Sequence, residues 1–383
     1  MIRKTSLSIL RLLLKATLFL PAAALLVACS SVQHIRNPYE TVNWSGYGQY
    51  KANLHTHTMV SDGWMNPQAV VGKYRDAGYH ILAISDHNSV TWPWSEFSKF
   101  KAGGKTEKRI ANKELKPQEE DWIRSEDLIF KDVNPDDAGM AAIQANELSD
   151  HHHMNSFFND HNGTKTEEES LKATAAKHGL TVLNHPGRYH DTNPKHYSLD
   201  WYLDLYRRHP HLLGMEVYNC GNRFPHDDML WDSILTVMAP VRPVWGFSND
   251  DMHSMRDFGR NWNVFLLPEL NEKAVRQAME KGAFYFVYSP DGHSGPKPPV
   301  IESIKVNQQK GKIAINASGS DSIVWIAEGK KIMRGKRFVL KKMQGKVRYV
   351  RAEVYGTGDI VVCTQPFFLN AEPFKPEHHE HRE

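Results

Sequence analysis

Histidine and carboxylate side chains recur in this 383-residue chain at spacings that suit metal binding. His55 and His57 are two positions apart, and side chains at positions i and i+2 of a strand share one face about 6.5 Å apart. Two imidazoles placed in this way can bind one ion. Asp251 and His253 repeat the spacing, whereas Asp250 would point to the opposite face. The pattern predicts a metal site of imidazole and carboxylate ligands.

Three further apolar segments are each followed by His, Asp or Glu. Asp86 and His87 follow the first, Glu147 follows the second and His185 follows the third. In a barrel of alternating strands and helices, the carboxyl ends of the strands form the rim that carries the chemistry. Five strand ends that each supply such a residue are hard to explain as coincidence. Imidazole and carboxylate without thiolate suit Zn, Mn or Fe, and do not distinguish them.

The composition agrees with a folded, histidine-rich protein. The chain has 21 His but only 3 Cys, too few for a zinc site built from thiolates, and its 40% hydrophobic content excludes a disordered chain. The length predicts two folded units. The formal charge of +3 includes four basic and no acidic residues in positions 1–28, so the remainder carries 43 basic against 44 acidic residues. This bulk charge does not indicate a nucleic-acid-binding surface, although it leaves room for a local patch.

The N-terminus has the pattern of an export signal. Basic residues lie in positions 1–15, and an apolar run of 13 residues, too short to span a bilayer, fills positions 16–28. The run ends in Leu26-Val27-Ala28-Cys29, which resembles a bacterial lipoprotein lipobox. The resemblance implies a signal peptide at 1–28, lipidation of Cys29, a tether at 29–49 and a location on the periplasmic or surface side of a bacterial envelope membrane. An ordinary secretory signal is the alternative.

Short apolar runs alternate with helical patterns from residue 50 to residue 292, as in βα units around a parallel sheet. Seven strands are expected: Ala52–His55, Ile81–Ser85, Ala141–Ala145, Thr181–Leu183, Gly214–Tyr218, Val244–Phe247 and Val264–Leu267. Five helices are expected: Pro67–Ala77, Glu167–Lys177, Leu199–Arg208, Asp228–Val237 and Glu272–Lys281. Seven strands favour a barrel over an open sheet. The charged stretch Lys101–Asp121 is interpreted as a solvent-exposed insertion between two of these units.

The pattern changes after a Pro-rich linker that precedes residue 300. Residues 300–370 contain short alternating segments separated by turn residues, which predict a small all-β sandwich. Residues 371–383 contain three further His and no apolar partner, so we expect a flexible tail. Cys220 and Cys363 fall in the two different units, and we expect two free thiols rather than a disulfide.

Taken together, the motifs resemble the PHP (polymerase and histidinol phosphatase) superfamily. The matching segments occur in order over residues 50–290: Leu54-His55-Thr56-His57, Ser61-Asp62-Gly63, Ile84-Ser85-Asp86-His87, Glu147, Asn184-His185-Pro186 and Asp251-Met252-His253. The resemblance implies a distorted (β/α)7 TIM-like barrel and a centre of three divalent metal ions.

The resemblance also implies a ligand set. The first ion would be held by His55, His57, Glu147 and Asp251; the second by Glu147 as a bridge, His185 and one further His; the third by Asp62, His87 and His253. For the further His, the sequence offers His151, His152 and His153. We favour His153, because it opens the segment 154–157 as a family strand would, with His152 as the alternative. Asp86 is expected to orient ligands rather than to bind an ion.

Such a cluster points to hydrolysis of a phosphoester. Metal ions lower the pKa of bound water toward 7, so a metal-bound hydroxide can attack phosphorus and no side-chain nucleophile is needed. Arg188 and Arg223 follow predicted strands and are candidates for binding the phosphate. The expected activity is that of a phosphatase or phosphodiesterase acting outside the cytoplasm on a phosphorylated small molecule, a lipid head group or a glycan phosphate.

Two alternatives remain. An extracytoplasmic nuclease would need a basic groove, which the overall charge does not favour, and a non-catalytic metal- or glycan-binding envelope lipoprotein would need the ligand set to be a relic. The segment Gly103-Gly104-Lys105-Thr106 ends like a phosphate-binding loop, but Lys99 stands where that motif requires glycine. We therefore expect no P-loop.

Overall fold

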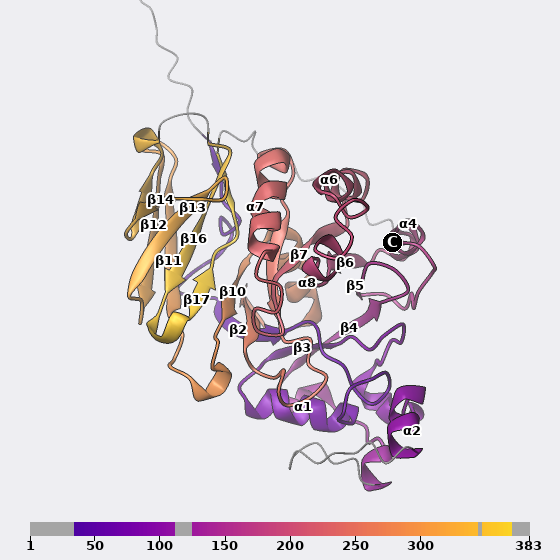
Figure 1. The fold of residues 1–383 in the computed structure, drawn as a ribbon. Coiled ribbons are helices and arrows are strands. Elements are labelled where there is room, and N and C mark those ends of the chain that lie inside the picture. The colour runs from indigo at the N-terminus through magenta and orange to yellow at the C-terminus, as the bar shows by residue number, and fades with distance from the viewer. Residues whose placement is uncertain (1–33, 112–124, 344–346, 370–383) are drawn as a thin grey trace, which may run out of the picture. The chain divides into compact units, whose positions relative to one another are not determined.

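Residues 34–111, 125–343 and 347–369 are described by a computed structural model of the chain (Figure 1). Cys29, the predicted signal peptide and the predicted C-terminal tail lie outside these residues. Among the described residues, no helix is long and apolar enough to cross a membrane.

The apolar runs of the first unit form a large sheet in which six strands are joined by parallel pairs. Strands β2, β3 and β4 pair in parallel with one another, as do β6, β7 and β8. Their bounds are β2 (Gly48–Asn53), β3 (Ile81–Ile84), β4 (Ala141–Leu148), β6 (Leu180–Leu183), β7 (Leu212–Asn219) and β8 (Trp245–Asn249). Parallel pairing brings the carboxyl ends of these strands to one edge of the sheet.

Three strands run against this parallel order. Strand β5 (Met154–Phe157) pairs antiparallel with β4 and β6, and β9 (Asn261–Leu267) pairs antiparallel with β2 and with β10 (Phe284–Tyr288). Only residues 149–153 separate β4 from β5, too few for the helical crossover that a parallel pair requires. Sequence reasoning expected a parallel barrel and did not allow for this hairpin.

Closure of a barrel is not confirmed. Among the described residues no backbone ladder joins β8 to β9. Instead, the Asn263 side chain bridges the two strands, because its amide Oδ1 accepts from Ser248 N at 3.1 Å and its Nδ2 donates to Ser248 O at 2.9 Å. The fold is therefore a mixed α/β sheet with a largely parallel part.

The five predicted helices are present, with ends within about one residue of those expected from the sequence. They are α1 (Pro67–Asp76), α4 (Glu167–Ala176), α6 (Leu199–Arg208), α7 (Asp227–Met238) and α8 (Glu272–Lys281). In four of them an Asn, Thr or Ser side chain caps the first turn by accepting a backbone N–H. Shorter helical segments are α2 (Gly104–Ala111), α3 (Pro135–Ala138), α5 (Gly187–His190), η1 (Trp94–Lys99), η2 (Ser125–Leu128), η3 (Gly292–Ser294), η4 (Leu340–Lys342) and η5 (Thr357–Asp359).

The described residues of 300–369 contain strands and single 3-10 turns but no α-helix, which supports the predicted all-β character. The strands are β11 (Val300–Asn307), β12 (Lys312–Ser318), β13 (Ser322–Ala327), β14 (Lys330–Arg334), β15 (Arg337–Val339), β16 (Tyr349–Tyr355), β17 (Val361–Cys363) and β18 (Phe367–Leu369). β11, β12 and β15 form one small sheet. The other five strands extend the large sheet, because β17 pairs with β10. The two regions therefore share one continuous sheet.

A buried ion-pair network also joins these strands to the first unit. The Arg351 guanidinium on β16 donates to both carboxylate oxygens of Asp232 on α7, at 2.8 and 2.7 Å, and to Glu353 at 2.7 Å. Tyr349 donates to Asp232 at 2.7 Å. Arg351 is only 2% exposed, so its charge depends on these partners.

The chain enters the described fold at the edge of the same strands. Strand β1 (Ile35–Arg36) pairs antiparallel with β18, and the backbone of Ile35 is held by the Gln308 side chain through two hydrogen bonds of 2.8 and 2.7 Å. Cys220 and Cys363 are both free thiols, as expected.

Candidate metal centre

The carboxyl ends of the parallel strands converge, as the sequence predicts. The segment after β2 continues beside the segment after β8, because His57 N donates to Met252 O at 2.9 Å. A further parallel bridge joins His87, after β3, to Glu147 on β4. Two of the candidate ligands, His185 and Asp251, have positive φ angles of 31° and 49°, a conformation that non-glycine residues adopt only where their surroundings hold them.

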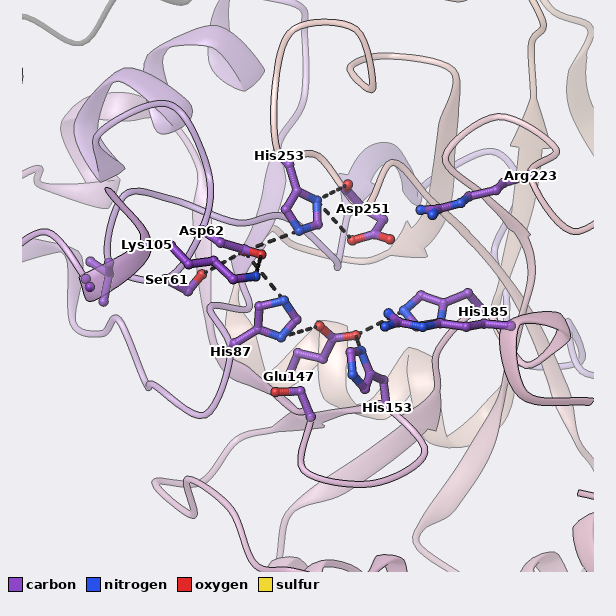
Figure 2. Close-up of a pocket in the computed structure, with 15 residues that line it drawn as sticks. Ser61, Asp62, His87, Lys105, Glu147, His153, His185, Arg223, Asp251 and His253 are labelled. Atoms are coloured by element: carbon purple, nitrogen blue, oxygen red, sulfur yellow. Dashed lines mark hydrogen bonds and ion pairs between the residues drawn. The ribbon is translucent and has the colours of Figure 1, made fainter. Parts of the chain in front are cut away.

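All nine ligands that the family resemblance implies lie in this cluster. They form four groups whose ligand atoms lie within 4.8 Å of one another: His57, Asp62, His87 and His253; His55, Glu147 and His185; His55, His57 and Asp251; His87, Glu147 and His153. Figure 2 shows seven of them, Asp62, His87, Glu147, His153, His185, Asp251 and His253, converging from several loops on one pocket.

Glu147 has the geometry of a bridging ligand. Its Oε1 lies 3.0 Å from His153 Nδ1, 3.2 Å from His185 Nε2 and 3.3 Å from His55 Nε2. Its Oε2 faces other imidazoles, at 2.9 Å from His87 Nδ1 and 3.6 Å from His57 Nε2. The two oxygens therefore face different sets of nitrogen donors.

Asp62 and Asp251 serve the two ends of the cluster. Asp62 Oδ1 lies 3.3 Å from His253 Nε2, 3.5 Å from His87 Nε2 and 3.7 Å from His57 Nδ1. Asp251 Oδ1 lies 3.2 Å from the Nε2 atoms of both His55 and His57. His57 thus presents one ring nitrogen to each end.

Imidazoles and carboxylates of the cluster shift one another's pKa values strongly. Burial, together with the neighbouring His253 and His87, lowers the pKa of His57 to about 3, so its imidazole is neutral and can donate lone pairs. Burial alone would raise the pKa values of Asp62, Glu147 and Asp251, but the surrounding imidazoles outweigh it and hold all three well below their usual range. In turn, the carboxylates outweigh burial and raise the pKa of His55, that of His87 to about 10 and that of His253 to about 9. Without other cations, protonated imidazoles therefore balance the three carboxylates, and divalent ions bound here would displace these protons and supply the same compensating charge.

The three adjacent histidines point in different directions. His153 lies against Glu147 and belongs to the cluster. The His152 ring is fully buried between Tyr189 and Trp201, with ring centroids at 4.1 and 5.5 Å, and so points away from it. His151 contacts the Ser170 hydroxyl at 2.7 Å. Of the three, the geometry favours His153 as the ligand.

Asp86 lies beneath the cluster and contacts the loop that carries Asp62. Its carboxylate accepts from Thr58 N at 2.7 Å, Thr58 Oγ1 at 2.7 Å, Ser61 Oγ at 2.6 Å and Thr91 Oγ1 at 2.6 Å. It belongs to none of the four ligand groups. These contacts fit the expected orienting role.

Glu216 on β7 is a positioning residue that sequence reasoning missed. Its Oε1 lies 2.8 Å from His55 Nδ1, while its Oε2 accepts from the backbone N of His185 at 2.9 Å. Asn219 and Asn249 donate to the same carboxylate at 2.8 and 2.9 Å. With the His55 proton held on Nδ1 by Glu216, Nε2 is left to face the cluster. Glu216 precedes the end of its strand, so no strand-end pattern identified it.

A cavity of about 630 Å³ opens over the cluster. Arg188 and Arg223, the predicted phosphate-binding residues, line it, and neither side chain forms an ion pair or hydrogen bond with another described residue. In Figure 2, Arg223 extends toward Asp251 on the side of the pocket away from Lys105. The cavity thus offers unpaired guanidinium groups beside the candidate ligands.

Lys105 is a second residue that the sequence interpretation missed. The stretch that contains it was expected to be solvated, but α2 docks on the loop that carries Asp62: Gly103 N donates to Met59 O at 2.7 Å and Arg109 donates to Asp62 O at 2.8 Å. Lys105 lines the cavity, and its Nζ lies 2.7 Å from Asp62 Oδ2. A Cβ on Gly103 would lie 2.4 Å from Val60 O, which explains the glycine. The remainder of the stretch, 112–121, lies outside the described residues.

Comparison with known proteins gives structural neighbours only. The sequence matches no protein-family model and no curated protein at a significant level. A two-domain protein from Bacteroides vulgatus, described as containing a predicted PHP-like metal-dependent phosphoesterase, is 14% identical, with 86% of this chain and 96% of that chain covered and a TM-score of 0.47.

Two further solved structures are similar over about three fifths of the chain. A proposed metal-dependent phosphoesterase from Bifidobacterium adolescentis is 16% identical over 60% of this chain and 96% of its own, with a TM-score of 0.35. The lesion-specific endonuclease EndoQ from Pyrococcus furiosus is 15% identical over 61% of this chain and 56% of its own, with a TM-score of 0.36.

Proposed function

We propose that this chain is a metal-dependent phosphoester hydrolase that uses a centre of three divalent ions. The observation that carries the proposal is the convergence of nine imidazole and carboxylate ligands at the floor of a cavity whose wall contains unpaired arginines. By the assignment that the family resemblance implies, His55, His57, Glu147 and Asp251 would hold one ion. Glu147, His153 and His185 would hold the second, and Asp62, His87 and His253, which lie together in one of the observed groups, would hold the third. Bound there, Zn, Mn or Fe ions supply an activated water at neutral pH and offset the charge of phosphoryl oxygens.

The protein side chains would bind and orient the substrate. Arg188 and Arg223 present planar guanidinium groups that can each donate two hydrogen bonds to a phosphate. Ser61 is the hydroxyl residue nearest Asp62 in the cavity wall, and its Oγ already donates to Asp86. Because this hydrogen bond to Asp86 engages the hydroxyl, Ser61 is poorly placed to act as a nucleophile. This agrees with attack by water.

The side chains around the candidate ligands would hold these ligands in position. Glu216 holds the His55 ring and the His185 backbone, and Asp86 holds the loop that presents Asp62. Because these groups are fully buried, they exclude water from behind the cluster. The open side of the site then faces only the cavity, where a phosphoester would enter.

The substrate class proposed is a phosphorylated small molecule, lipid head group or glycan phosphate outside the cytoplasm. Support for the location is the sequence around Cys29, which resembles a lipobox. A nuclease and a non-catalytic binding protein remain the alternatives.

Hydrolysis assays with matched variants test the proposal. Metal-loaded protein should hydrolyse a chromogenic phosphomonoester or phosphodiester, and Glu147→Ala should abolish this activity and lower the bound metal. Asp76→Asn, which changes an exposed carboxylate on α1, is the matched control and should leave both unchanged. Activity on single-stranded DNA alone would favour the nuclease, and glycan binding without any hydrolysis would favour the binding protein.

A further inference from the structure

Charge is distributed very unevenly between the two regions of the chain. Residues 300–369 contain 13 Lys and Arg against 5 Asp and Glu, whereas residues 29–299 contain 28 against 35. The near-neutral overall charge therefore hides a strongly basic C-terminal region. Because Arg351 and Glu353 are buried and paired, the excess positive charge lies on the surface.

Four lysines of this region gather around one end of its small sheet. Lys310 lies in the turn between β11 and β12, and Lys312 follows it at the start of β12. Lys341 and Lys342 belong to η4, which is held beside this turn because Leu340 N donates to Gly311 O at 2.9 Å. We call these four residues the basic end. All four are exposed, and none of them forms an ion pair with another described residue.

The adjoining sheet face continues the positive charge. Lys305 and Arg337 lie opposite Ala314 from the two sides of β12, so the three residues form one row across the sheet. Lys312 is two residues before Ala314 and therefore shares this face. A flat face with several unpaired cations fits a flat anionic partner better than a small ligand.

The chain enters the fold at the basic end. Ile35 is bound by Gln308, which precedes Lys310 by two residues. Ile35 follows Cys29 by six positions, and six extended residues span about 20 Å at most. Lipid on Cys29 would therefore hold Ile35 within that distance of a bilayer surface and keep the adjoining basic end close to it.

We propose that the basic end docks on the anionic phospholipid headgroups of a bilayer. Lysines near an anionic surface are attracted to it over a Debye length of about 8–10 Å, and the acidic remainder of the chain is repelled. This contact adds an electrostatic signal to the single lipid anchor expected from the sequence. Stable membrane attachment commonly needs two such signals.

Vesicle binding tests the proposal without using the active site. The test protein begins at Gln33, where one compact unit of the chain starts, so that no lipid anchor contributes. It should co-sediment with vesicles of phosphatidylcholine and phosphatidylglycerol, bind pure phosphatidylcholine vesicles far more weakly, and dissociate as salt is raised. Changing all four lysines of the basic end to Gln should weaken partitioning by about 100-fold or more.

A matched variant controls for net charge. Lys73, Lys131, Lys195 and Lys273 are exposed lysines of the first region, and changing these four to Gln removes the same charge but should retain vesicle binding. Both quadruple variants should keep the thermal stability of the parent and its hydrolysis of a soluble phosphoester. Equal loss in the two variants, or no loss in either, overturns the proposal. Binding to a DNA oligonucleotide without binding to anionic vesicles also overturns it and points to a nucleic-acid partner.

Discussion

The candidate metal centre and the basic end place their charges in opposite ways. In the centre, seven of the nine candidate ligand side chains are buried and His87 and His253 are half-buried, and residues such as Glu216 and Asp86 hold them in fixed positions. At the basic end, lysines are exposed and unpaired among the described residues. A centre that binds ions needs defined geometry, whereas a surface that binds many headgroups needs only a local excess of charge. Single substitutions in the candidate metal centre should therefore cause large losses of function. Substitutions at the basic end should each remove a smaller, additive part of vesicle binding.

Loss of the Glu147 carboxylate, the proposed bridge, is expected to have the largest effect. Glu147→Ala removes an oxygen donor from two ligand groups at once. Removing a residue that only orients a ligand typically lowers metal affinity or activity by about 10- to 100-fold. The loss of activity in Glu147→Ala should be larger than this. Elemental analysis and turnover of a chromogenic phosphoester measure it, and full metal content with full activity would discredit the cluster.

The junction between the two regions is expected to matter next, through stability. Asp232→Ala leaves the buried Arg351 without its bidentate partner, and breaking a buried pair in this way costs about 3–5 kcal/mol of unfolding free energy. Urea denaturation measures this loss. Asp204→Ala, which removes an exposed carboxylate on α6, is the control and should change stability by less than about 1 kcal/mol. If the two variants are equally stable, the junction does not bind the regions together.

Glu216→Gln tests whether fixed geometry is what distinguishes the centre. The amide retains the size of the side chain but weakens its hold on the His55 proton, so metal affinity should fall by about 10- to 100-fold. Metal titration gives the affinity, and nitrogen NMR of the histidine rings reports the His55 tautomer. Unchanged affinity and an unchanged tautomer would show that Glu216 serves only packing.

The smallest effect is expected where the cavity wall contacts substrate. Arg188→Lys and Arg223→Lys retain the charge but lose the planar fork, so KM for a phosphoester should rise by about tenfold while metal content stays constant. Steady-state kinetics and elemental analysis separate the two readouts. A loss of metal in either variant would move that arginine from substrate binding to support of the centre.

The sequence predicted which side chains come together, because the signal of most of them is local. A His-x-His or Asp-x-His pair at the end of an apolar run gives both the donors and their common face, whereas Asp62 and His153 were named from the family resemblance. All nine candidates lie close together in the structure. The five helices were predicted for the same reason, since apolar spacing is a local feature.

What sequence reasoning missed depends on contacts between distant segments. Lys105 reaches the cavity only because α2 docks on the loop of Asp62, about 40 residues earlier in the chain, and a charged, mixed-sign stretch looks solvated without that contact. The basic end is likewise assembled from two separate segments, around Lys310 and Lys341. The antiparallel β5 and the continuous sheet were missed because hydrophobic periodicity does not determine the direction of a strand or the strand with which it pairs.

The pairing of β10 with β17 restricts how this protein can be divided. Strand β10 has the sequence Phe-Tyr-Phe-Val-Tyr, and β17 covers one of its two hydrogen-bonding edges. A fragment ending before residue 300 would leave that aromatic strand as an open edge, which is a template for aggregation. The C-terminal strands therefore protect the large sheet from edge-to-edge association, and a recombinant protein in which these strands were exchanged would need a replacement strand beside β10.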